Sequence, residues 1–384
     1  MAADGDRALD RMTADVLAPI VARALNCDRV EVTEWRWQPI AYDVYLPNRQ
    51  LVQVTGRAEA GGAVRDWTVV LKLSRPDDRL TPQNREKQER EVLAYESGLL
   101  ADLPGGLAAP RVLAIDRPAD GAVWLWLEHL VDAYAGRWTP DQFRQAAYDL
   151  GAFNGAYLGE RPLPEAAWLT RQWPELHSEA AKIPAALAEI VRLVEDPRVH
   201  AAFVPEEVRQ MPGLLRDQAS FKAALSRLPV VLCHHDASQA NLFARHRADG
   251  AAETVAIDWE SVGHGTFGAD IATLVFGTIR RGLFQADDVH VLDSAVFDGY
   301  LAGLRAAGWR GDPALVRLGY TASIALRWFQ LHSALRRLTD PGIRSFRGSK
   351  PEPEAEAARQ FMLLTSYLLA CAEAARGLIK RVGL

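Results

Sequence analysis

The stretch HHDASQAN, residues 234–241, places chemically capable polar side chains directly behind the apolar run VVLC. It contains the spacing H-x-D-x-x-x-x-N, in which His234 precedes Asp236 and Asn241 follows it. Seventeen residues after Asn241, a second short β-type run, TVAI, ends in Asp258. The two runs could pair as a hairpin, which would bring Asp236, Asn241 and Asp258 to one end of the same ribbon. Phosphoryl transfer uses this set: one carboxylate near the attacking hydroxyl, and an amide and a second carboxylate that hold Mg²⁺ on the phosphates.

Each member of this set also has a simpler interpretation. Three fixed positions occur together by chance in many proteins, and an aspartate after an apolar strand is more often a turn or helix cap than a metal ligand. The combination is more specific, because Asp236, Asn241 and Asp258 occur in order and at strand ends. The sequence therefore favours a phosphotransferase loop over three unrelated polar residues.

A lysine nearer the N-terminus supports the same chemistry. Lys72 stands alone inside the apolar β-type run WTVVLKL, where a packed core would not favour it. Taken alone, it would be read as a solvated lysine on an edge strand. On the helix that follows, Glu91 falls on the apolar-facing side, whereas Glu86 and Glu89 fall on other faces. A strand lysine paired with a helix glutamate grips the α- and β-phosphates in kinase-type sites. Glu91 is the preferred partner and Glu89 the second choice.

The elements that must position these residues differ between the two parts of the chain. The first part has an amphipathic opening helix and short β-type runs, which predict a small, mostly antiparallel sheet with one inserted helix. From Trp138 onward the pattern is largely helical. We expect an N-terminal lobe over residues 1–130 and a helical C-terminal lobe over 131–384, with a connector near 129–138. The expected strands are 30–37, 49–60, 65–73, 110–116 and 121–130; the expected helices are 7–25, 84–103, 139–159, 176–196, 213–227, 267–281, 287–307, 313–338 and 353–381.

Composition sets the broad class. The chain has 384 residues, 49% of them hydrophobic, and a net charge of −5, which gives no basic excess for nucleic-acid binding. The mildly acidic balance fits a cationic substrate. The three cysteines are too few and too far apart for a disulfide framework, which indicates a reducing cytoplasm. The N-terminus is polar, and the apolar stretch 319–338 is interrupted by Arg327, Gln330 and His332, so we expect neither a signal peptide nor a membrane span.

Four segments together resemble one known family. HHDASQANLF and AIDWESVGHGTFGADIATL, preceded by VVLKL and REVLAY, are similar to motifs of the aminoglycoside phosphotransferase and choline kinase-like family, from about residue 35 to 340. The resemblance implies an α+β, protein-kinase-like fold with a small β-rich N-lobe that carries one key helix, and a large, mostly helical C-lobe. It also implies transfer of the γ-phosphate of ATP or GTP to a small-molecule hydroxyl with Mg²⁺ as cofactor.

The resemblance also implies roles for individual residues. Asp236 would be the catalytic base or would orient the substrate hydroxyl. Asn241 and Asp258 would bind Mg²⁺, and Lys72 with Glu91 would position the nucleotide phosphates.

Further roles carried over from the family concern support and nucleotide contact. The connector around Glu128, His129 and Leu130 would offer backbone groups to the purine. His234 would brace the catalytic loop, and so would Asp270, which stands in GADIA at a helix start.

The sequence departs from the family pattern at two places. His235 stands where the family usually has glycine, so it could touch substrate or only pack. No glycine lies between Gly5 and Gly56, so no glycine-rich phosphate loop precedes Lys72. The turn within QPIAYDVY would have to cover the phosphates, which leaves the covering residues unassigned.

The acceptor is left open by the sequence. The stretch ALRWFQLHSAL offers Trp328, Gln330 and His332 as substrate contacts, although a tryptophan in an apolar helix is more often core. An aminoglycoside or other antibiotic, an aminosugar and a choline-like amino alcohol all fit. The alanine- and arginine-rich composition resembles that of a high-GC bacterium, which makes an antibiotic-resistance or biosynthetic kinase reasonable. We expect a monomer or a homodimer.

Two other function classes compete with the phosphotransferase. A metal-dependent HD-type phosphohydrolase would use His235 and Asp236 as ligands and would need further histidines at metal-binding spacing, but the others are scattered singly. A pseudokinase-like nucleotide- or ligand-binding protein would have no transfer activity. Such a protein usually lacks one of the lysine, aspartate, asparagine and aspartate set, and all four are present here.

Overall fold

In the computed structural model the chain divides into two compact units. The first comprises Met1–Ala101 and Ala109–Val131, and the second Asp102–Ala108 and Asp132–Leu384. The short segment Asp102–Ala108 belongs with the second unit, which a single boundary at residue 130 does not anticipate. The structure describes residues 9 and 12–384, except for residues 41–47, 135, 160, 172–179, 248–249, 251, 285–288, 341, 344–345, 348–349 and 352–353.

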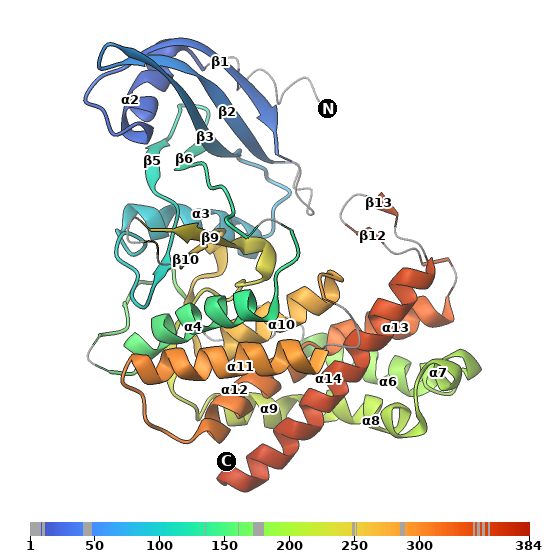
Figure 1. The fold of residues 1–384 in the computed structure, drawn as a ribbon. Coiled ribbons are helices and arrows are strands. Elements are labelled where there is room, and N and C mark those ends of the chain that lie inside the picture. The colour runs from blue at the N-terminus through green and yellow to red at the C-terminus, as the bar shows by residue number, and fades with distance from the viewer. Residues whose placement is uncertain are drawn as a thin grey trace. The chain divides into compact units, whose positions relative to one another are not determined.

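The first unit is built on a five-stranded antiparallel sheet in the order β1-β2-β3-β6-β5 (Figure 1). Gly61 and Gly62, both at positive φ, form the two-residue turn between β2 and β3. The turn within QPIAYDVY lies largely outside the described residues. The strands are β1 (Glu31–Pro39), β2 (Arg49–Ala60), β3 (Ala63–Ser74), β5 (Val112–Asp116) and β6 (Val123–Glu128).

Alternation along β3 sets the direction of its lysine. Val69, Leu71 and Leu73 are buried in the core cluster that also contains residues of helix α2 (Ala14–Ala24). Successive side chains of a strand point to opposite faces, so Lys72 faces away from that core. The opposite face is where the inserted helix can meet it.

The inserted helix is α3 (Pro82–Glu96). Thr81 caps its N-terminus by accepting a hydrogen bond from the Asn84 N–H, and Pro82 occupies the first helical position. The helix ends at Glu96, earlier than the expected 103, because the chain turns at Gly98, whose φ is +74°.

The second unit is mostly helical, with short strands arranged in small sheets. Helices α4 and α11 pack along each other, and α14 packs against α12 (Figure 1). The helices of eight or more residues are α4 (Pro140–Ala156), α6 (Ile183–Leu193), α8 (Pro205–Arg216), α9 (Gln218–Leu225), α10 (Ala269–Arg280), α11 (Val289–Ala306), α12 (Pro313–Ala325), α13 (Trp328–Thr339) and α14 (Glu354–Val382); the short α7 is Pro197–Ala202. The strands are β4 (Leu107–Ala108), β7 (Thr170–Arg171), β8 (Val230–Cys233), β9 (Leu242–His246), β10 (Ala252–Ala256), β11 (Gly263–Thr266), β12 (Phe346–Arg347) and β13 (Lys350–Pro351).

The α+β class with a β-rich N-terminal part and a helical C-terminal part is therefore confirmed. Within it, the predicted hairpin has a different first strand. β10 pairs with β9, the run LFARH, whereas β8 (VVLC) pairs with β11 in another sheet. The LFARH run is nearest in sequence to TVAI, so a short connection joins them. Asp236 and Asn241 consequently lie on the loop between two sheets.

The predicted helix over residues 313–338 is two helices. The break lies at Arg327, whose backbone leaves the helical region at φ −87° and ψ 38°. Neither proline nor glycine marks the break, so sequence periodicity alone could not reveal it.

Helix α14 is long and apolar enough, over Ala355–Val382, to cross a membrane by length and composition alone. A core helix of a soluble protein passes the same test. Leu364, Leu368 and Ala372 are buried within the second unit, where α14 packs against α12, α8 and α10. This helix is therefore weak support for a membrane span.

Candidate functional site

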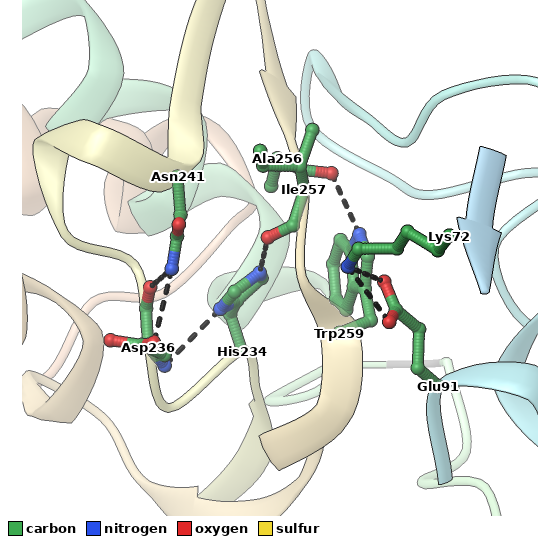
Figure 2. A network of polar contacts seen from close by, with 8 residues as sticks. All are labelled: Lys72, Glu91, His234, Asp236, Asn241, Ala256, Ile257 and Trp259. Atoms are coloured by element: carbon green, nitrogen blue, oxygen red, sulfur yellow. Dashed lines mark hydrogen bonds and ion pairs between the residues drawn. The ribbon is translucent and has the colours of Figure 1, made fainter. Parts of the chain in front are cut away.

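Asp236 and Asn241 contact each other directly on the loop after β8. The Asn241 Nδ2 donates to Asp236 Oδ2 at 3.0 Å and to the Asp236 carbonyl oxygen at 2.9 Å (Figure 2). The Asn241 carbonyl in turn accepts from the Ile257 N–H at 2.9 Å. Since Ile257 precedes Asp258, this bond ties the loop to the third predicted residue.

Asp258 lies at the end of β10 in an unusual backbone conformation. Its φ of +65° and ψ of +60° are left-handed, at the start of a single 3₁₀ turn, Trp259–Ser261. Three non-glycine residues have positive φ among those described, and two of them, His235 and Asp258, flank Asp236 and Asn241. Such conformations cost about 1–3 kcal/mol and cluster at functional sites.

The carboxylates around Asp236 repel one another. Burial, together with the negative charges of Asp258 and Glu260, raises the pKa of Asp236 to about 6. The positive charges of Arg327 and Arg281 act against them. Negative charge is therefore concentrated here in a partly buried place, where a cation would relieve the repulsion.

The donor set suits a hard divalent cation. Because the Asn241 nitrogen donates to Asp236, the amide oxygen is the atom left to serve as a ligand. That oxygen and the carboxylate oxygens of Asp258 are the hard oxygen ligands that Mg²⁺ and Ca²⁺ favour. The residues present fit such an ion.

His234 and Asp270 hold the loop in place. The Asp270 oxygens accept from the backbone N–H groups of His234 at 3.1 Å and His235 at 2.8 Å, and Asn154 Nδ2 donates to the same carboxylate. The His234 ring accepts from the Asp236 N–H through Nδ1, so Nε2 donates to the Ile257 carbonyl at 2.9 Å. Burial lowers the pKa of His234, which keeps this neutral tautomer.

Asp270→Asn is expected to destabilise the second unit by about 2 kcal/mol, because an amide offers one acceptor oxygen to three donors and leaves a buried N–H unpaired. The measurement is the thermal denaturation midpoint. Asp298→Asn, on the exposed surface of α11, is the control and should leave the midpoint unchanged. Equal midpoints for the two variants would contradict the bracing role.

His235 packs between the loop and β11. A Cβ at Gly265 would stand 2.4 Å from the His235 Cε1, and the His235 Nε2 lies 3.2 Å from the His264 carbonyl. Among the described residues, His235 groups with Cys233 and Asp270 at metal-binding distance. Asp270 is already committed to backbone N–H groups, and burial raises the pKa of the Cys233 thiol. This grouping also omits Asp236, which an HD-type site would require.

In the first unit, Lys72 and Glu91 form an ion pair. The Lys72 Nζ lies 2.7 Å from Glu91 Oε1 and 2.8 Å from Oε2 (Figure 2). Glu91 is 6% exposed, whereas Glu86 and Glu89 are exposed on the other side of α3. The choice of Glu91 over Glu89 as the lysine's partner agrees with this geometry.

Two of the connector residues, Glu128 at the end of β6 and His129 after it, already have polar contacts within the first unit. The Glu128 N–H donates to the Arg111 carbonyl, and the Glu128 carboxylate accepts from the Arg111 backbone and guanidinium. The His129 Nε2 lies 3.1 Å from Gln53 Nε2, and burial lowers the pKa of His129. Of the three residues expected to face a purine, Glu128 therefore has its backbone N–H already engaged.

The three substrate candidates on α13 have structural partners. Trp328 is 3% exposed, and the His332 Nε2 lies 2.7 Å from Glu189 Oε2 on α6. Gln330 is half-buried in the first turn of the helix. A further residue near Asp236 is Arg327, immediately before these three, whose positive charge acts on the Asp236 carboxylate. Its only signal in the sequence is an arginine inside an otherwise apolar stretch.

A loop carboxylate with an amide beside it, and a strand lysine paired with a helix glutamate, define the kinase-type phosphotransferase class. Residues 54–315 match the model of the phosphotransferase enzyme family, more than half of the chain, and the protein belongs to that family. It is thus a phosphotransferase, the enzyme class that the sequence resemblance implied. No curated protein sequence matches the chain.

Several solved structures are similar to the chain. A microcompartment-associated aminopropanol kinase is 18% identical over 94% of this chain and 97% of its own, with a TM-score of 0.47. An aminoglycoside phosphotransferase from Alicyclobacillus acidocaldarius is 14% identical over 88% and 93%, with a TM-score of 0.47. A choline kinase from Cryptosporidium parvum is 14% identical over 90% of each chain, with a TM-score of 0.46.

Proposed function

We propose that this protein is a Mg²⁺-dependent O-phosphotransferase that moves the γ-phosphate of ATP or GTP to a hydroxyl of a small molecule. The observation that carries the proposal is the Asp236–Asn241 pair, joined through Ile257 to the strand end that holds Asp258. This arrangement concentrates a carboxylate, an amide and a second carboxylate, which is the set that phosphoryl transfer uses.

Asp236 acts on the acceptor in this reaction. Its carboxylate accepts a hydrogen bond from the acceptor hydroxyl and takes the proton as that oxygen bonds to the γ-phosphorus. The bond between the γ-phosphorus and the β–γ bridging oxygen breaks, and the nucleoside diphosphate leaves. The Asn241 amide holds one Asp236 oxygen, so the acceptor meets a fixed carboxylate. Positioning of this kind supplies much of the rate enhancement.

Asn241 and Asp258 are the residues that would hold Mg²⁺. The amide oxygen of Asn241 and the Asp258 carboxylate supply hard oxygen ligands. When bound, the ion neutralises charge on the transferring phosphoryl group. The left-handed backbone at Asp258 sets where its side chain leaves the chain.

Lys72 with Glu91 is proposed to position the α- and β-phosphates. Glu91→Gln is expected to raise the KM for nucleotide about 10-fold, because a neutral amide holds the lysine less firmly than a carboxylate. The measurement is the nucleotide dependence of transfer. Glu89→Gln, on the exposed side of the same helix, is the matched control. The same KM shift in both variants would count against a specific role for the Lys72–Glu91 pair.

We also propose a small hydroxylated acceptor, a cytoplasmic location and a monomeric or homodimeric state. The similar proteins are named for aminopropanol, aminoglycosides and choline, and small hydroxylated molecules of that size are the acceptors proposed for this chain. The three cysteines are free, which suits a reducing cytoplasm. A monomer or homodimer with a role in antibiotic resistance or biosynthesis fits these features.

The test is a transfer assay with labelled ATP and GTP, Mg²⁺, and a panel of antibiotics, aminosugars and amino alcohols. Label should reach an acceptor with the native protein and not with Asp236→Asn. Thermal stabilisation by Mg·ATP or Mg·GTP without any transfer would favour the pseudokinase-like alternative. Tightly bound zinc, manganese or iron in the purified protein would instead favour the hydrolase.

A further inference from the structure

Arg327 is linked to the catalytic loop through one threonine. It stands at the junction of α12 and α13, and its Nη2 donates to the Thr273 Oγ1 at 2.8 Å. The Thr273 hydroxyl lies 3.4 Å from both the His235 carbonyl, one residue before Asp236, and the Ala269 carbonyl of its own helix, and it can donate to either. The guanidinium is therefore bonded to a residue of α10 that also contacts the loop with the proposed base.

The rest of this guanidinium has few polar contacts. It lies over the Phe276 ring, 4.9 Å from the ring centroid, and its Nε is buried with no hydrogen-bond partner among the described residues. Within that part of the chain, no carboxylate forms an ion pair with it. Burial lowers the pKa of Arg327 to about 10, so it stays charged at neutral pH. A partly buried cation of this kind is stabilised by an anion that hydrogen-bonds it.

Two more arginines lie within electrostatic reach. The charge of Arg281, at the C-terminus of α10, acts on Asp236, and the charge of Arg280 acts on Arg327. Helix α10 is packed tightly on the loop, since a Cβ at Gly277 would stand 3.0 Å from the Ser238 Cβ. Positive charge thus gathers beside Asp236 on the side formed by α10 and the α12–α13 junction.

We propose that the acceptor carries an anionic group, a carboxylate or a phosphate monoester, close to its reactive hydroxyl, and that Arg327 binds this group with support from Arg281. The inference rests on the proposed function and names the substrate class of that site. It departs from the cationic substrate that the net charge of −5 suggests. A guanidinium recognises both anions through paired N–H donors.

The competing interpretation is a cationic acceptor held by Glu260. Glu260 is the other carboxylate whose charge reaches Asp236, and the proposed mechanism gives it no task. The two interpretations predict that different variants lose activity. Glu260→Gln should impair only a cationic acceptor, whereas Arg327→Gln should impair only an anionic one.

The test compares acceptors matched in size and differing in charge. Each set contains a hydroxy acid, the matching compound with a phosphate monoester in place of the carboxylate, the corresponding amino alcohol and a neutral diol. In the transfer assay, anionic members should be preferred, and Arg327→Gln should raise their KM roughly 10- to 100-fold with less than about 3-fold change for neutral members. Preference for hydroxy acids or for phosphorylated members distinguishes the two anions. A preference for amino alcohols or diols would overturn the inference while leaving the phosphotransferase intact.

A binding measurement covers the case in which no member is phosphorylated. Anionic members at about 10 mM should raise the thermal midpoint of the native protein with Mg²⁺ and a non-hydrolysable nucleotide, and should not do so for Arg327→Gln. An equal shift in both proteins, or no shift by any anion, would overturn the inference. Arg327→Lys, which keeps the charge, should retain part of the effect. The matched control is Arg317→Gln, another arginine stacked on a phenylalanine and paired instead with Asp293; it should lower stability without changing acceptor preference.

Discussion

Asp236→Asn is expected to lower the rate of phosphate transfer by about 10²- to 10⁴-fold, the range that a positioned general base contributes. The amide can still accept the hydrogen bond from Asn241 through its oxygen, so the loop geometry is preserved. What is lost is the negative charge that takes the hydroxyl proton. The measurement is kcat with the best acceptor of the panel at saturating nucleotide.

Stability separates this loss from misfolding. Asp236 is crowded by the negative charges of Asp258 and Glu260. Removing one of these charges should raise the thermal midpoint in metal-free buffer, since active sites hold such repulsion at the expense of stability. A variant that is both more stable and nearly inactive would identify Asp236 as part of the chemistry. Transfer at the native rate would contradict the assignment of the base.

Features that depend only on residues close together in the sequence could be predicted from the sequence alone. The alternation in β3 and the helical face of Glu91 were enough to propose the Lys72 pair, because both elements obey simple periodicities. The paired glycines between β2 and β3 specified their turn in the same way. These features need no knowledge of distant parts of the chain.

Features that depend on distant pairing were not accessible from the sequence. The partner of β8 is β11, about 30 residues further along the chain. Nothing in the sequence VVLC itself indicates that β8 pairs with β11 and not with β10. The break at Arg327 has no proline or glycine to mark it, and only tertiary structure reveals that its side chain reaches Thr273. The neighbouring Trp328 and His332 looked more suitable for substrate, yet they are occupied by packing and by Glu189.

The buried carboxyl group of Asp149, on α4, helps to hold β10, the strand that leads to Asp258. Asp149 on α4 accepts from the Thr254 Oγ1 on β10 at 2.7 Å and from Gln145 Nε2 at 3.0 Å. A Cβ at Gly106 would stand 3.0 Å from Asp149 Oδ1, so the segment Asp102–Ala108 closes over the same carboxyl. Burial raises the pKa of Asp149 from 3.8 to about 7, although both hydrogen bonds lower it.

The stability of the second unit should therefore depend on pH through Asp149. The folded protein binds this proton more tightly than the unfolded chain, so the group's contribution is fully present below about pH 4, falls as pH rises towards 7, and is constant above that. A change of about 3 pKa units corresponds to about 4 kcal/mol at most. The neutral carboxyl is the form that the fold favours.

Asp149→Asn should remove this dependence while keeping the contacts. The amide oxygen can accept from Thr254, and the Gln145 amide can turn to accept from the new NH₂ group. Between pH 5.5 and 8, the stability advantage of the variant over the native protein should widen by about 2 kcal/mol. The measurement is urea unfolding of both proteins at each pH, where titrations shared by the two proteins cancel in the difference. A difference that stayed constant with pH would show that Asp149 is ionised in the folded protein, and that β10 is held by a buried charge in place of a neutral acid.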